Sequence, residues 1–129
     1  LLNEGTDVTI IATGHLVWKA IEAGEQLAAK GISAEIINIH TIKPLDSAAV
    51  IASVKKTGCV VTAEEHQMNG GLGDSVAQLL ARELPRPQEF VAVNDSFGES
   101  GTPDQLMTKY GLDTVNIVDA AVKVISRKS

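Results

Sequence analysis

Hydrophobic residues along the chain form short runs that alternate with longer amphipathic stretches. Residues 7–13, 34–39 and 58–63 are apolar and rich in β-branched side chains, a pattern typical of strands buried on both faces of a parallel sheet. Residues 90–93 form a shorter run of the same kind. Each of the first three runs is followed by apolar residues at helical spacing, over residues 16–30, 46–56 and 73–84. This alternation predicts an α/β fold with a mostly parallel sheet covered on both sides.

Capping residues mark where these helices begin and end. Asp46 is placed to cap the second helix, and Gly31 and Gly58 follow the first two helices, where a left-handed residue commonly ends a helix. The sequence of residues 102–105 (Thr-Pro-Asp-Gln) predicts the start of a further helix that reaches Tyr110. A last helix is expected from residue 113 or 114. Its predicted apolar face consists of Val115, Val118, Ala121, Val122 and Ile125.

Length and composition indicate one globular domain over residues 1–129. Only 3% of the residues are aromatic and the formal net charge is −5, which argues against nucleic acid as a partner. No apolar stretch approaches the roughly 20 residues of a membrane span. Cys59 is the only cysteine, which fits a reducing compartment, and we expect a cytoplasmic protein. Because the chain opens on Leu1 without a methionine, we expect a fragment of a longer protein.

Several common catalytic patterns are missing from the sequence. It contains no G-x-G-x-x-G dinucleotide motif and no Walker loop, and residues 98–101 fall one residue short of a nucleophile elbow. His15, His40 and His66 lie far apart, with no cysteine or second histidine at ligand spacing. The sequence therefore predicts no metal site in this chain.

The segment 64–74 carries the densest set of candidate functional residues. It leads from the carboxyl end of a strand to the start of a helix, where parallel α/β sheets build their sites. Its glycines allow bare backbone N–H groups at a helix start, where an anion is favoured, although Asp74 can fill that place internally. The alternatives are an interdomain contact, small-anion binding, or acid/base chemistry. The candidate residues are Glu64, Glu65, His66, Asn69, Gly70, Gly71, Gly73 and Asp74.

Trp18 is the second candidate. At 100° per residue it falls opposite the apolar stripe of its helix, to which Ile21 belongs, and on the side of Glu22 and Glu25. Tryptophan is a frequent interface anchor, although a single exposed hydrophobic residue is also ordinary. We treat Trp18, with His15 in the turn before the helix, as a candidate interface.

Four ordered segments resemble the C-terminal domains of transketolases. They are residues 7–14, residues 41–46 (Thr-Ile-Lys-Pro-Leu-Asp), the 64–74 segment, and residues 97–103 (Phe-Gly-Glu-Ser-Gly-Thr-Pro). Each piece is weakly specific, but the ordered set is strong and covers nearly the whole chain. The resemblance implies a three-layer α/β/α domain with four parallel strands in order 2-1-3-4. It also implies a preceding antiparallel edge strand, here truncated, with residues 1–2 as its remnant.

The resemblance also implies a parent enzyme that transfers two-carbon ketol units between sugar phosphates, using thiamine diphosphate and Mg²⁺. In that family the cofactor lies between an N-terminal and a pyrimidine-binding domain, across a homodimer. This sequence lacks the thiamine motif, since Gly73-Asp74 is followed by Ser75 and no Asn-Asn pair occurs. The resemblance therefore assigns no catalytic or cofactor-binding residue here, and it implies an accessory domain that contacts the pyrimidine-binding domain or a separate N-terminal subunit.

Other interpretations stay open at this point. Related domains end 1-deoxyxylulose-5-phosphate synthases and the beta subunits of 2-oxo-acid dehydrogenases, although residues 97–101 look more like transketolase. The domain can also be a regulatory module in which the 64–74 segment holds a small anionic metabolite. A flavodoxin-like binder would keep the same sheet, but no flavin-stacking aromatic lies near the strand-order switch.

Overall fold

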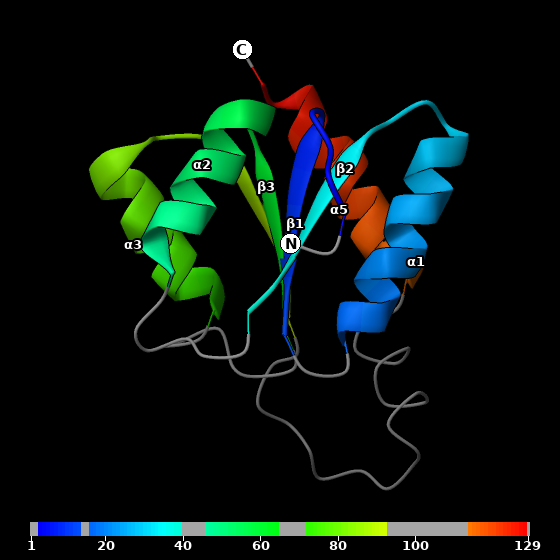
Figure 1. Ribbon diagram of the computed structural model, residues 1–129, viewed down its shortest axis with the longest axis horizontal. Coiled ribbons are helices and arrows are strands. Elements are labelled where there is room, and N and C mark those ends of the chain that lie inside the picture. The colour runs from blue at the N-terminus through cyan, green and yellow to red at the C-terminus, as the bar shows by residue number, and fades with distance from the viewer. Residues whose placement is uncertain (1–2, 14–15, 40–45, 65–71, 93–113, 129) are drawn as a thin grey trace, which may run out of the picture.

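The computed structural model describes residues 3–13, 16–39, 46–64, 72–92 and 114–128. Strands and helices alternate along the chain (Figure 1). In chain order the elements are β1 (Val8–Ala12), α1 (Leu16–Ala29), β2 (Ala34–Asn38), α2 (Ser47–Thr57), β3 (Val60–Glu64), α3 (Leu72–Glu83), β4 (Gln88–Ala92) and α5 (Thr114–Ser126). The helix predicted over residues 102–110 lies outside the described residues. The alternation predicted from the hydrophobic pattern is confirmed for every other element.

The four strands form one parallel sheet in the order β2-β1-β3-β4, as the family resemblance implied. In the register of the two central strands, Ile10 pairs with Val61 and Ala12 with Ala63. An isolated antiparallel bridge joins Asn3 to Ile36 at the outer edge of β2. Residues 1–2, which the resemblance marked as the remnant of an antiparallel strand, lie outside the described residues.

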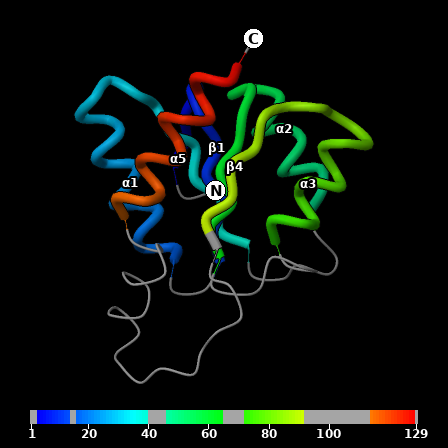
Figure 2. The backbone as a smooth tube through the Cα atoms, turned by 180° about the vertical axis from the view of Figure 1, so that it is seen from behind, coloured from blue at the N-terminus to red at the C-terminus, as the bar shows by residue number. Residues whose placement is uncertain are grey.

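In the described part of the chain, two helices cover each face of the sheet, which gives three layers (Figures 1 and 2). Helices α1 and α5 lie on one face and pack against each other. The core on this side includes Ile10, Leu27 and Ile117. Helices α2 and α3 lie on the other face, over a core that includes Ile11, Val54 and Leu80. Because both faces are covered, β1 and β3 are buried along their whole length, which explains their unbroken apolar runs.

The caps predicted from the sequence are present. The Asp46 carboxylate accepts a hydrogen bond from the Ala49 N–H at 3.2 Å, at the start of α2. Gly58 ends that helix with φ of +86°, and Gly31 takes φ of +80° after α1. None of the helices in the described part of the chain is both long and apolar enough to cross a membrane.

The predicted apolar face of the last helix is confirmed for Val118 and Ala121, which are buried, and for Ile125, which packs against the core, but it is wrong for Val115 and Val122. The buried residues of α5 are Ile117, Val118, Ala121 and Val124. Val115 and Val122 are instead 55% and 42% exposed. The helix carries apolar residues on most of its circumference, so the sequence did not indicate which of them face the sheet.

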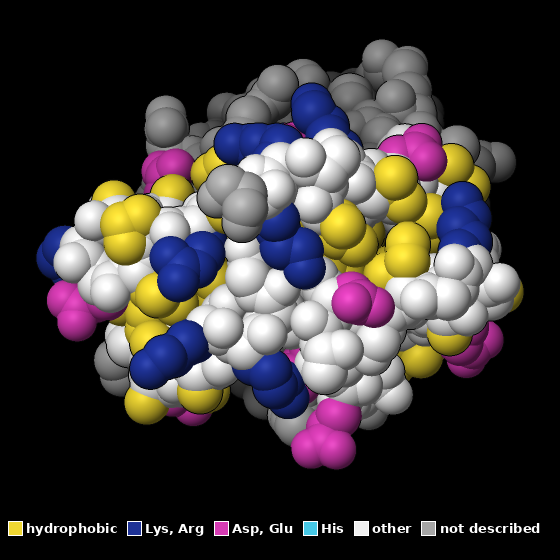
Figure 3. All heavy atoms as spheres, turned by 90° about the horizontal axis from the view of Figure 1, so that it is seen from above, with side chains coloured by type: hydrophobic (Ala, Val, Ile, Leu, Met, Phe, Trp, Pro, Cys, Tyr) yellow, Lys and Arg dark blue, Asp and Glu magenta, His cyan; other side chains and the backbone are white. Residues whose placement is uncertain are grey.

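Lysine and arginine side chains are spread over the end of the molecule at which the helices finish (Figure 3). Lys55 and Lys56 lie in the last turn of α2, Arg82 in that of α3 and Lys123 in that of α5. A positive charge at a helix C-terminus interacts favourably with the helix dipole. These cations are therefore explained by helix stability, and by themselves they indicate no anionic ligand.

Candidate functional site

The Glu64 carboxylate lies at the carboxyl end of β3 and is buried, with 1% of the residue exposed. It accepts a hydrogen bond from the N–H of Leu72 at 2.8 Å and another from the N–H of Gly73 at 2.6 Å. These N–H groups belong to the first turn of α3, where backbone donors have no partner within the helix. Glu64 therefore caps α3 with a full negative charge at its positive end.

Gly73 allows α3 to approach the sheet closely. A Cβ atom at this position would lie 2.5 Å from Cδ2 in the ring of Phe90, a residue of β4, and 3.2 Å from Glu64 Oε2. The side chain of Gln88 reaches the same place, and its Nε2 donates to the Gly73 carbonyl at 3.1 Å and to Thr62 Oγ1 at 3.2 Å. The start of α3 is thus fixed by groups from both β3 and β4.

This arrangement changes the interpretation of the 64–74 segment. The sequence suggested that the glycines expose backbone N–H groups to a small anion, or that Asp74 fills the site. The structure places the carboxylate of Glu64 on the N–H groups of residues 72 and 73. An external anion would have to displace a buried side chain from two charge-assisted hydrogen bonds.

The remaining candidates of this segment divide into two groups. Asp74 lies in the first turn of α3 and is partly buried. Glu65, His66, Asn69, Gly70 and Gly71 lie outside the described residues, as does His15. Their expected roles stay predictions. The structure brings together Glu64 and Gly73 from opposite ends of the segment.

Trp18 lies on the outer surface of α1 and is 46% exposed, as the helical periodicity predicted. The Lys19 Nζ atom lies 4.5 Å from the centroid of its ring, a cation–π contact that covers part of the indole. One turn further along α1, Glu22 accepts a hydrogen bond from Thr114 Oγ1 at 3.0 Å, which joins α1 to the start of α5. This hydrogen bond joins the two helices one turn away from Trp18.

The two outer layers of the domain differ in their exposed hydrophobic residues. The described part of the chain exposes five large hydrophobic side chains, and four of them lie on α1 and α5. They are Trp18, Ile21, Val115 and Val122. The fifth, Phe90, lies on β4, and neither α2 nor α3 exposes one. We call these four residues the α1/α5 face. Exposed apolar side chains concentrated in one layer of a domain point to an interaction site on that layer.

The chemistry of the described residues is limited. No three of their His, Cys, Asp and Glu side chains are grouped so that they could hold a metal ion. The Cys59 thiol is buried, and burial raises its pKa; the Lys128 charge lowers the pKa and the Asp7 charge raises it, with a net increase. A neutral, enclosed thiol is a poor nucleophile. No ligand set for the Mg²⁺ of a thiamine diphosphate site is grouped among the described residues, and no catalytic step is assigned to them.

Sequence reasoning missed Gln88 and Phe90 because both act through contacts between strands and a helix. It missed the capping role of Glu64 for the same reason. One signal was available: a glutamate at the end of a buried strand, followed eight residues later by a helix start without a Ser, Thr, Asp or Asn cap.

Comparison with known proteins gives consistent matches over the whole chain. The profile described as "Transketolase, C-terminal domain" matches residues 1–117. The chain is 50% identical to the 6-deoxy-6-sulfo-D-fructose transketolase subunit SqwH of Clostridium sp. (strain MSTE9), over 100% of the chain and 40% of that protein. It is 41% identical to a putative transketolase C-terminal section of Methanocaldococcus jannaschii, over 99% of the chain and 40% of that protein. A 1-deoxy-D-xylulose-5-phosphate synthase of Geobacter sulfurreducens is 39% identical, over 99% of the chain and 20% of that enzyme.

Solved structures agree with these matches. A structure described as a split gene transketolase, inactive beta4 tetramer, superimposes with a TM-score of 0.95 and 46% identity, over 100% of this chain and 42% of that one. Transketolase from Leishmania mexicana shares the fold, with a TM-score of 0.70 at 17% identity, over 95% of this chain and 17% of that one. The chain spans 40% of the length of the first two relatives. On the matched profile and these identities, the chain belongs to the transketolase C-terminal domain family.

Proposed function

We propose that this chain is an accessory C-terminal domain of a transketolase-type enzyme. The parent transfers two-carbon ketol units between sugar phosphates with thiamine diphosphate and Mg²⁺, which other parts of the enzyme bind. The domain contributes contacts to a pyrimidine-binding domain and to a homodimer, or to a separate N-terminal subunit where the enzyme is split. In this proposal residues 1–129 form one domain and the enzyme is cytoplasmic.

The single observation that carries this proposal is the α1/α5 face. A domain that stood alone in water would gain nothing from gathering its exposed Trp, Ile and Val side chains on one outer layer. Trp18 supplies the large, rigid ring that interface anchors share. The two helices are joined by the Thr114–Glu22 hydrogen bond and by their buried residues, so the face is preformed. A preformed apolar face loses little side-chain entropy when a partner covers it.

The alternative of a regulatory anion site at the 64–74 segment receives less support. The two N–H groups that such an anion would use already bind the Glu64 carboxylate. Both oxygens of that carboxylate are engaged, and the side chain is buried. An anion carrying a similar charge would gain little by replacing it and would leave Glu64 without these partners.

The first experiment tests where the chemistry takes place. We expect the 129-residue chain to show no ketol transfer from a ketose phosphate and no thiamine diphosphate binding by calorimetry, with Mg²⁺ present. The complete enzyme, measured in parallel, is the positive control. Turnover or tight cofactor binding by the chain would overturn the proposal. Formation of 1-deoxy-D-xylulose 5-phosphate by the complete enzyme would move the assignment to the synthase branch, which the 39% identity to that enzyme makes the second candidate.

The second experiment tests the docking face in the complete enzyme. We expect Trp18→Asp to weaken assembly, measured by analytical ultracentrifugation, because the change places a charge in an apolar contact. Gln78→Ala, on the exposed side of α3 in the opposite layer, is the matched control. Circular dichroism verifies that both variants stay folded. Unchanged assembly in Trp18→Asp would exclude the α1/α5 face as the interface.

A further inference from the structure

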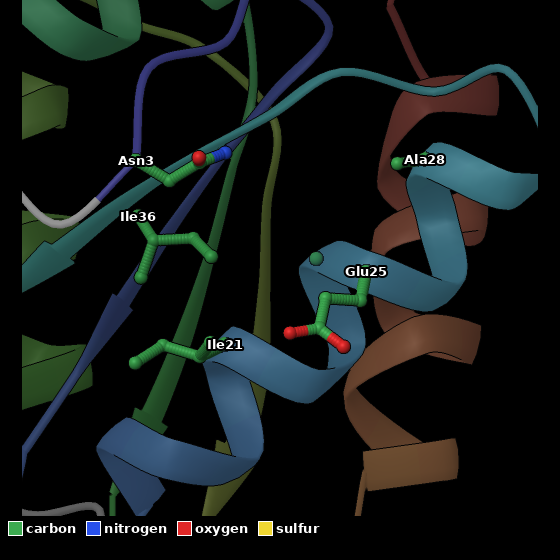
Figure 4. A pocket seen from close by; sticks show the side chains of 6 residues that line it. Asn3, Ile21, Glu25, Ala28 and Ile36 are labelled. Atoms are coloured by element: carbon green, nitrogen blue, oxygen red, sulfur yellow. The ribbon is translucent and has the colours of Figure 1, made fainter.

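The segment of residues 3–7, which we call the strap, precedes β1 and lies against the outer edge of β2. The Ile36 N–H donates to the Asn3 carbonyl at 2.9 Å, and Asn3 Nδ2 donates to the Ala34 carbonyl at 2.8 Å. Figure 4 shows Asn3 beside Ile36, on one wall of a cleft of about 220 Å³ between α1 and β2. The strap is thus bonded to β2 through both its backbone and a side chain.

The other end of the strap is bonded to the residue before β2. The Asp7 N–H donates to the Ser33 carbonyl at 2.8 Å, and the Ser33 N–H donates to Asp7 Oδ2 at 2.7 Å. The Thr6 N–H donates to Ser33 Oγ at 3.2 Å. This reciprocal pairing closes the turn through which the strap enters β1.

At Gly5 the backbone of the strap lies directly against the backbone of β2. A Cβ atom at this position would lie 2.3 Å from the Ala34 carbonyl carbon and 2.6 Å from the Glu35 nitrogen. Both are backbone atoms, which cannot move aside as a flexible side chain can. Any side chain at position 5 would therefore lift the strap from β2.

The Glu35 carboxylate joins the strap to a third element. Glu35 is only 4% exposed, and its Oε1 atom accepts a hydrogen bond from the Gly5 N–H at 3.2 Å. The same oxygen forms an ion pair with Lys56 Nζ, in the last turn of α2. Ser53, one turn earlier in α2, also hydrogen-bonds the carboxylate and lies 2.7 Å from Thr9 Oγ1 of β1.

We infer that Glu35 is a latch: its buried carboxylate holds the strap on β2 and couples the position of the strap to the C-terminal end of α2. The physical reason is that the same carboxylate oxygen binds both the Gly5 N–H of the strap and the Lys56 ammonium of α2. When the strap lies in place it keeps water from the carboxylate and strengthens the attraction to Lys56. When Lys56 holds the charge in place, the acceptor of the Gly5 N–H is in turn fixed. The inference depends only on contacts within the chain and not on the proposed function.

The latch sets the direction in which the polypeptide approaches the sheet. Residue 3 is bonded to β2 on the side of α1, and residue 5 lies on the carboxylate shared with α2. The strap is therefore bonded to β2 and, through the Glu35 carboxylate, linked to α2.

Amide hydrogen exchange of the 129-residue protein, measured by NMR, tests the latch. We expect Glu35→Gln to speed exchange at the Gly5 amide by about 10- to 100-fold, because the substitution weakens a hydrogen bond to a charged group. The matched control is Glu25→Gln, since Glu25 is an exposed carboxylate on α1. The Ile10 amide, in the centre of β1, reports global opening in every variant. If Gly5 exchanges no faster in Glu35→Gln than in Glu25→Gln, Glu35 is not the latch.

Gly5→Ala tests the coupling without touching either charged group. The new methyl lifts the strap, and we expect faster exchange at the Gly58 amide, which donates to the Val54 carbonyl at the end of α2. Ile10 is the reference for global opening here too. Faster exchange at the residue 5 amide alone, with the Gly58 amide exchanging as in the wild type, would refute the coupling. Because this variant keeps the Glu35–Lys56 pair, it remains informative even if Glu35→Gln fails to fold.

Discussion

Replacing Glu64 by glutamine is the most direct test of how the 64–74 segment is built. The carboxylate accepts two backbone N–H groups, and a hydrogen bond to a charged group contributes about 1.5–3 kcal/mol. Glutamine keeps one acceptor oxygen but points an NH₂ group at a second N–H donor. We therefore expect Glu64→Gln to lower the free energy of unfolding by about 2–4 kcal/mol. Urea denaturation followed by circular dichroism measures the change.

The control for this experiment lies in the same helical turn. Asp74→Asn removes a negative charge near the start of α3 without changing the acceptor of the Leu72 and Gly73 N–H groups. Loss of a favourable charge–dipole interaction alone costs about 0.3–1 kcal/mol. If Glu64→Gln destabilises the protein no more than Asp74→Asn does, the capping role of Glu64 is wrong.

Chemical rescue distinguishes the loss of the carboxylate at position 64 from a general loss of stability caused by the substitution. Glu64→Ala vacates the space beside the two N–H groups, and formate is small enough to take the place of the carboxylate. If formate binds there with a dissociation constant of about 0.1 M, about 1 M formate restores about 1.4 kcal/mol. Chloride at the same ionic strength is the comparison. Equal effects of formate and chloride would show that the vacated N–H groups do not select a carboxylate.

Three further predictions concern other buried groups. Gly73→Ala forces a methyl group against the Phe90 ring and should cost roughly 1–3 kcal/mol in urea denaturation. Cys59 should react with a thiol reagent at pH 7 only as fast as the protein opens, because burial raises its pKa and encloses the thiol; rapid labelling of the native protein would contradict this. Burial raises the pKa of Glu35, but hydrogen bonds from Lys56 and its other partners lower it below the ordinary value of 4.5. The stability lost in Glu35→Gln should therefore be greatest above pH 4.5 and shrink as pH falls through the lowered pKa, as denaturation at several pH values will measure.

The layers of this fold could be predicted from the sequence because local signals agreed with the tertiary structure. The apolar runs of β1 and β3 are long enough to indicate burial on both faces, and Asp46 and Gly58 set the limits of α2. The strand order came from the family resemblance, since local patterns do not determine which strands are neighbours. In α5 the local signal was ambiguous, because Val115 and Val122 compete with Ile117 and the other buried residues for the inner face.

The candidate site could be predicted only in part. The period of α1 placed Trp18 on the outside, but it also suggested that Ile21 faces the sheet, whereas the structure exposes it. The buried glutamates were not foreseen in their actual roles, because a charged residue in a strand is ordinarily exposed. Glu35 and Glu64 are buried because backbone N–H groups from distant segments approach them. Such contacts form only once the elements have assembled, and the sequence carried at most the indirect signal for Glu64 of a helix start that lacks a Ser, Thr, Asp or Asn cap.

Glu35 and Glu64 have a common consequence for function. Each is a carboxylate that, in another protein of this architecture, could face a ligand or a proton donor. Here Glu35 binds the Gly5 N–H and the side chains of α2, and Glu64 binds two backbone N–H groups of α3. Burying either carboxylate without those partners would cost several kcal/mol. The Glu35 charge thus stabilises the position of the strap, and the Glu64 charge stabilises the start of α3. The apolar α1/α5 face is not required by any of these internal contacts, and for that reason we assign the outward function of the domain to it.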